Sequence, residues 1–120
     1  MARMTPEGKV KKQLRDYLDT LAPDVWYFMP VPTGFSDKGT PDFLINFFGV
    51  FVAVETKAKG NKPTPLQDRT LRIIQAAHGI AMVINDKNIE DSIECLKLLA
   101  AQIHTAGTAK FPSEIVPLYG

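Results

Sequence analysis

Residues 42–57 read DFLINFFGVFVAVETK and carry the clearest signal for the fold. Two β-prone apolar runs, 43–48 and 50–54, meet around Gly49. Aromatic and β-branched runs separated by a glycine predict two antiparallel strands joined by a tight turn. The sheet is therefore expected to be built outward from this hairpin.

The register of the hairpin determines where the polar residues at its two ends lie. If Phe48-Gly49 form a two-residue loop, Phe47 pairs with Val50, and Asp42 lies directly opposite Glu55. Facing Cβ atoms in an antiparallel pair are about 5 Å apart. A loop longer by one residue, without a bulge, would put the two carboxylates on opposite faces. Phe-Gly is also not a dipeptide that favours this turn, so the prediction depends on an even loop or a compensating bulge.

A lysine follows on the same face. Lys57 lies two residues after Glu55, and strand side chains alternate with period two. Two carboxylates as close as Asp42 and Glu55 would repel each other unless a positive charge lay between them. The three residues together indicate a divalent cation held beside a phosphate. The alternative is a solvated strand end next to a Thr-Pro-Asp turn, which explains either fragment alone but not the shared face.

The first helix is expected to add a third acid. Thr5 can cap the helix, Pro6 suits its first position, and Glu7 favours its N-terminal dipole. Glu7 also precedes Val10 by three residues, so it lies on the apolar stripe that faces the sheet. Other side chains of this helix are expected to point outward: Lys11, Lys12 and Arg15.

The remaining patterns complete an α/β domain. A helix is expected to begin at Thr64-Pro65, and the continuous apolar run 80–84 predicts a strand buried on both faces. The crossover from the hairpin to that strand requires a parallel connection. The sequence thus predicts one domain over residues 1–120, with a mixed central β-sheet flanked by helices. The expected order is a first helix, strands at 25–31, 43–48 and 50–54, a second helix, a strand at 80–84, and a last helix from residue 86 or 88 to 103.

Composition excludes several classes of protein. The chain has 120 residues and 45% hydrophobic residues, which suits one globular domain. It has no apolar run long enough for a membrane span and no signal-peptide core, so a cytoplasmic location is the default expectation. The single cysteine, Cys95, excludes an intramolecular disulfide framework and a Cys-rich zinc site. Its helical context predicts a small core residue.

Positive charge is concentrated in the first part of the chain. The net charge is +1, but residues 1–72 carry +3 and residues 73–120 carry −2. This imbalance is consistent with a phosphate-binding surface, although any single lysine could equally lie on a solvated helix face. The candidate nucleic-acid contacts are Lys9, Lys12, Lys38, Lys59, Lys62 and Arg69.

The order of these motifs resembles a known nuclease superfamily. Glu7, then Gly39-Thr40-Pro41-Asp42, then Glu55-Thr56-Lys57, then Gln67 is similar to the PD-(D/E)XK pattern. The Gly-x-Pro-Asp spelling and the short length look most like a stand-alone VRR-NUC (virus-type replication-repair nuclease) domain. The resemblance spans Glu7 to about Ile84 and implies a restriction-endonuclease-like core.

The resemblance also implies a role for each matching residue. Asp42, Glu55 and the backbone carbonyl of Thr56 would bind a divalent metal, and Glu7 would complete the acidic cluster. Lys57 would position or activate the attacking water. Gln67 would orient Lys57 or contact the scissile phosphate. An all-oxygen ligand set favours Mg²⁺ or Mn²⁺ over zinc.

The expected function is therefore a metal-dependent DNA endonuclease. Members of this family cleave DNA phosphodiesters, and short stand-alone forms act as homodimers on branched structures such as four-way junctions. The expected location becomes the cytoplasm of a bacterium or of a virus-infected host cell. Two alternatives stay open: a non-catalytic nucleic-acid-binding module, and a restriction-like nuclease that reads sequence.

Overall fold

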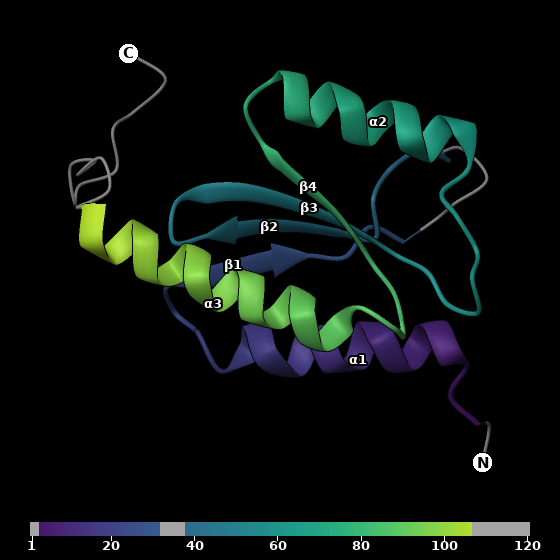
Figure 1. The fold of residues 1–120 in the computed structure, drawn as a ribbon, viewed down its shortest axis with the longest axis horizontal. Coiled ribbons are helices and arrows are strands. Elements are labelled where there is room, and N and C mark those ends of the chain that lie inside the picture. The colour runs from purple at the N-terminus through teal and green to yellow at the C-terminus, as the bar shows by residue number, and fades with distance from the viewer. Residues whose placement is uncertain (1–2, 32–37, 107–120) are drawn as a thin grey trace.

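The computed structural model describes residues 3–31 and 38–106. Its elements follow the predicted order of helix, three strands, helix, strand and helix (Figure 1). Their bounds are α1 Pro6–Asp19, β1 Val25–Phe28, β2 Phe43–Phe47, β3 Val50–Thr56, α2 Pro65–Ala76, β4 Ile80–Ile84 and α3 Ile89–Ala106.

The four strands form one mixed sheet in the spatial order β1-β2-β3-β4. β1, β2 and β3 pair antiparallel, whereas β4 pairs parallel to β3. Helices α1 and α3 lie on one side of the sheet, and α2 lies on the other, above β3 and β4 (Figure 1). The predicted α/β architecture, a mixed sheet flanked by helices, is confirmed.

The main core lies between the sheet and the layer of α1 and α3. Alternate residues of β2 and β3 point into it, as the period of a strand requires. Burying aliphatic and aromatic side chains of this size stabilises the fold by about 1.5–3 kcal/mol each. The side chains that are almost fully buried include Val10, Leu14, Leu18, Phe43, Ile45, Phe47, Val52, Val54, Ile84 and Leu96.

The hairpin has the predicted register, with Phe47 paired to Val50. Both loop residues have positive φ, 51° at Phe48 and 88° at Gly49. This geometry matches strand twist but is unfavourable for phenylalanine. Three contacts support the turn: the Phe48 ring packs edge-on against Phe47 and against His104, and Asn46 Oδ1 accepts a 2.8 Å hydrogen bond from the Gly49 N–H.

Caps explain where the first two helices begin. The Thr5 hydroxyl accepts a 3.0 Å hydrogen bond from the Gly8 N–H, and Thr64 caps α2 in the same way. Each cap is followed by a proline at the first turn, which does not need its missing N–H there. Among the described helices, none is long and apolar enough to cross a membrane.

Three expectations about the strands and the last helix are wrong. β4 is an edge strand and most of it is half-buried, because the sheet ends there and no further strand of the described chain covers it. Cys95 is exposed, since the buried side of α3 passes through Ser92 and Leu96 instead. β1 ends at Phe28 and does not reach residue 31.

Candidate metal and phosphate site

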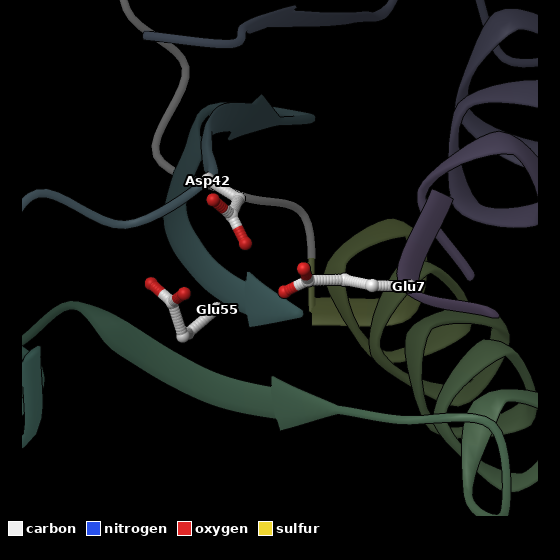
Figure 2. Close-up of side chains that lie close together, drawn as sticks. All are labelled: Glu7, Asp42 and Glu55. Carbon is white, nitrogen blue, oxygen red and sulfur yellow. The ribbon is translucent and has the colours of Figure 1, made fainter. Parts of the chain in front are cut away.

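Three carboxylates from separate parts of the chain meet at one end of the sheet. Glu7 comes from the first turn of α1, Asp42 immediately precedes β2, and Glu55 lies near the end of β3. One oxygen from each lies within 4.8 Å of those of the other two. Figure 2 shows the three side chains pointing toward a shared space. The hairpin register brings Asp42 and Glu55 together, and the docking of α1 adds Glu7.

Thr56 fixes the position of Asp42. Its backbone N–H and its hydroxyl both donate to Asp42 Oδ2, at 2.9 Å and 2.6 Å. Thr56 is fully buried and Asp42 is partly exposed, so these hydrogen bonds are partly shielded from competing water. The Oδ1 atom of Asp42 is thereby left directed away from Thr56 and toward other partners.

Glu55 is an ionisable group in an environment that disfavours its charge. It is 2% exposed, and its Oε2 has no hydrogen-bond partner among the described residues. Burial, together with repulsion from Asp42, raises the pKa of Glu55 to about 8. Such a carboxyl must either keep a proton at neutral pH or share its charge with a cation.

Two carboxylates of the cluster, Glu55 and Asp42, each lie close to a lysine. Lys57 Nζ lies 3.9 Å from Glu55 Oε1, and Lys57 is 15% exposed. Lys11 Nζ lies 3.8 Å from Asp42 Oδ1. The expectation that Lys11 points outward is wrong, because Lys11 lies one turn after Glu7 on the same face of α1 and reaches Asp42.

Gly39 allows the loop before Asp42 to pass close to α2. A Cβ atom built at this position would lie 2.7 Å from the Thr70 hydroxyl and 2.8 Å from the Leu66 carbonyl oxygen. Both distances are shorter than real side chains tolerate, so a larger residue would push the loop away from α2. The glycine of the Gly-Thr-Pro-Asp motif therefore helps to place Asp42.

A cavity of about 390 Å³ adjoins the acidic cluster on the side of Glu7. Its other lining residues come from the start of α1 and from the segment after β3: Thr5, Pro6, Lys57, Ala58, Lys59, Asn61 and Lys62. Three lysines and one glutamate thus face the same space. Of the predicted nucleic-acid contacts, Lys59 and Lys62 line this cavity, whereas Lys9, Lys12, Lys38 and Arg69 are exposed elsewhere.

Gln67 participates in a helix cap. Its Oε1 accepts a 2.9 Å hydrogen bond from the Thr64 N–H, while its own N–H donates to the Thr64 hydroxyl at 3.2 Å. This is a reciprocal capping box. Within residues 38–106, no hydrogen bond joins Gln67 to Lys57. The Thr-x-x-Gln spacing of residues 64–67 was a sufficient signal for the cap.

The donor atoms fit a hard divalent cation. All are oxygens, and the described cluster contains no histidine or cysteine. Carboxylate oxygens are the ligands that Mg²⁺ and Mn²⁺ prefer. The buried Oε2 of Glu55, which has no hydrogen-bond partner, is the atom for which a cation would compensate.

Sequence reasoning missed two contributors to this site. The Thr56 side chain holds Asp42, although only its backbone carbonyl was expected to take part. Lys11 contacts Asp42, although its helical position was assigned to solvent. The i, i+4 spacing of Glu7 and Lys11 was a usable signal, because such residues share a helix face.

Comparison with known proteins adds one structural match. A solved structure described as "VRR_NUC domain" superposes with a TM-score of 0.63 and 28% sequence identity. The match covers 75% of this chain and 96% of that chain. No protein-family model matches the sequence, and no curated protein matches it.

Proposed function

Because the chain is a VRR-NUC-like domain, we propose that it is a divalent-metal-dependent endonuclease that hydrolyses DNA phosphodiester bonds. The observation that carries this proposal is the meeting of Glu7, Asp42 and Glu55, with a buried Glu55 oxygen that lacks a hydrogen-bond partner. An acidic cluster that served only solubility would not place a carboxylate at 2% exposure.

Each residue of the site has a distinct task. Asp42 and Glu55 hold the cation, Mg²⁺ or Mn²⁺, with the backbone carbonyl of Thr56, and Glu7 completes the cluster. When bound, the cation lowers the pKa of a coordinated water and offsets the charge that develops on the phosphate. Lys57, held near Glu55, positions or activates the attacking water. Gln67 orients Lys57 or contacts the scissile phosphate through its carboxamide nitrogen.

The substrate is proposed to be branched DNA, such as a four-way junction, bound by a homodimer. The cationic wall formed by Lys57, Lys59 and Lys62 suits a phosphate backbone next to the site. Trp26 and Phe28 support self-association, because they expose 65% and 51% of their surface on the edge strand β1. Large exposed apolar residues on one strand are typical of subunit contacts.

The proposal is tested by cleavage of labelled four-way junction, flap and linear duplex DNA with Mg²⁺ or Mn²⁺. Asp42→Asn and Glu55→Gln keep the side-chain shapes but remove charge from the ligand set. Losing several kcal/mol of charge stabilisation should lower the cleavage rate about a thousandfold or more. Binding of the same DNA should be largely retained. Lys57→Ala should lower the rate more than it weakens metal binding.

Asp91→Asn is the matched control, because Asp91 is an exposed acid on α3. It should cleave like the unaltered protein. Normal turnover by both site variants would refute the metal-site assignment. Tight binding without cleavage of any substrate would identify a binding module, and sequence-dependent cleavage of unbranched duplex would identify a restriction-like enzyme. A mass measurement in solution tests the homodimer.

A further inference from the structure

Lys11 is the one lysine that contacts Asp42 among the described ion pairs. It lies one turn after Glu7 on α1, and its side chain is 33% exposed. Its amine is therefore close to the cluster yet open to solvent on one side. Lys57 occupies the corresponding position beside Glu55, so Asp42 and Glu55 face two different lysines.

The geometry around Asp42 gives Lys11 a specific partner. Oδ2 is taken by two hydrogen bonds from Thr56, and Lys11 lies against the other oxygen, Oδ1. Oδ1 is thus the oxygen that Lys11 and a cation would share. Like charges that compete for one carboxylate oxygen disfavour each other.

The neighbouring lysine has a different arrangement. Lys12 Nζ lies 2.6 Å from Asp16 on the exposed side of α1, one turn further on. The Lys12 contact is local to the helix, whereas Lys11 reaches from α1 to a residue 31 positions away. The Lys11 contact therefore depends on the tertiary fold at the site.

We propose that Lys11 is a further substrate-binding lysine of this site, in addition to the lysines that line the cavity. In the free protein it neutralises Asp42. When a cation takes over Asp42 Oδ1, the flexible stem of Lys11 turns its amine to a backbone phosphate of the bound nucleic acid. This inference rests on the proposed metal-dependent function, and it adds a residue to the substrate-contacting set.

The test compares Lys11→Met with Lys97→Met. Methionine keeps an unbranched side chain and removes the charge. Lys97 is a matched control because it pairs with Glu94 at 3.2 Å on the exposed side of α3. Mn²⁺ binding is measured by calorimetry without DNA, and duplex binding is measured against salt concentration in the presence of Ca²⁺.

Lys11→Met should bind Mn²⁺ about two- to fivefold more tightly, the effect of removing one partly exposed competing charge. The slope of the logarithm of its DNA-binding constant against the logarithm of salt concentration should become shallower by about 0.9, the value for one lost phosphate contact. Lys97→Met should change neither quantity. Lys11→Arg should keep the original slope, since it keeps the charge.

Two results would overturn the inference. The first is a salt dependence of DNA binding in Lys11→Met that equals that of Lys97→Met, which would remove the phosphate contact whatever the Mn²⁺ affinity. The second is weaker Mn²⁺ binding by Lys11→Met, which would mean that Lys11 prepares Asp42 for the metal. A failure of this inference differs from a failure of the proposed function. If Asp42→Asn bound Mn²⁺ as well as the unaltered protein does, Asp42 would not be a metal ligand, and the proposed metal site itself would be wrong. Thermal unfolding of Lys11→Met and Lys11→Arg confirms that both variants fold.

Discussion

Glu55 shows how a single residue can be unfavourable for folding and still define a site. Its carboxyl is buried beside Asp42, and Lys57 at 3.9 Å relieves only part of that cost. A buried charge of this kind is stabilised when a cation is bound beside it. The buried carboxylate is therefore better explained by a bound cation than by packing.

The raised pKa of Glu55 predicts a pH dependence of stability. The folded carboxyl titrates near pH 8 and the unfolded one near 4.5, so between these values the folded state binds more protons. The free energy of unfolding contributed by Glu55 is fully present below pH 4.5. It falls by up to about 1.4 kcal/mol per pH unit as the pH rises to 8.

The measurement is denaturant unfolding in a metal chelator from pH 4 to 9. Subtracting the curve of Glu55→Gln isolates this group, because glutamine does not titrate. A flat difference between the two proteins would contradict the assignment of the raised pKa to Glu55.

Among the helices, α2 begins directly after the loop that leads from the site at the end of β3. The capping box of Thr64 and Gln67 fixes where α2 starts after Pro63. Gln67 thus has a structural role that is independent of its proposed contact with Lys57 or phosphate. The two roles can be separated because Thr64 shares only the first.

Gln67→Ala and Thr64→Ala should each lower the free energy of unfolding by about 0.5–1.5 kcal/mol, since each removes one capping hydrogen bond. If Gln67 also contacts Lys57 or the phosphate, its variant should lose about tenfold or more in cleavage rate beyond the loss in Thr64→Ala. The rates are compared at a temperature where both variants remain folded. Equal cleavage rates of the two variants would show that Gln67 acts only as part of the helix cap.

The hairpin shows what sequence reasoning could reach. The apolar runs 43–48 and 50–54 on either side of Gly49 predicted the hairpin, but its register followed only if Phe48-Gly49 formed a two-residue loop. The structure has that loop, so Phe47 pairs with Val50 and Asp42 lies close to Glu55. The reason that Phe48 tolerates a positive φ was not predictable, because its ring packs against His104 at the far end of the chain.

The wrong expectations concern residues whose burial depends on neighbours that are distant in the sequence. The apolar run of β4 is compatible with a central or an edge strand, and only the strand order distinguishes the two. Whether the side chains of Lys11 and Cys95 face the protein or the solvent depends on the orientation of α1 and α3 about their axes. A pattern of apolar residues leaves that orientation uncertain by about one side chain.

At the scale of the whole molecule, the site joins segments that are otherwise far apart in the chain. Glu7 belongs to the layer of α1 and α3, whereas Glu55 lies in β3 and Asp42 immediately precedes β2 (Figure 2). A cation bound by all three would link helix and sheet and bind only the folded state. Metal binding should therefore stabilise the whole domain.

Mn²⁺ at a hundred times its dissociation constant should raise the free energy of unfolding by about 2.7 kcal/mol. For a domain of this size, the midpoint of thermal unfolding should rise on the order of 10 °C. The rise should disappear on adding a chelator and in Asp42→Asn, and it should persist in Asp91→Asn. An equal rise in both variants would indicate metal binding elsewhere.

The position of the cap of α1 has a practical consequence. Thr5 and Pro6 form part of the wall of the 390 Å³ cavity, so any polypeptide fused directly ahead of them would emerge beside its mouth. The last turn of α3, at Ala106, lies toward the opposite end of the long axis from the start of α1 (Figure 1). Purification tags, fluorophores and surface tethers are therefore best kept away from the start of α1, where the cavity lies.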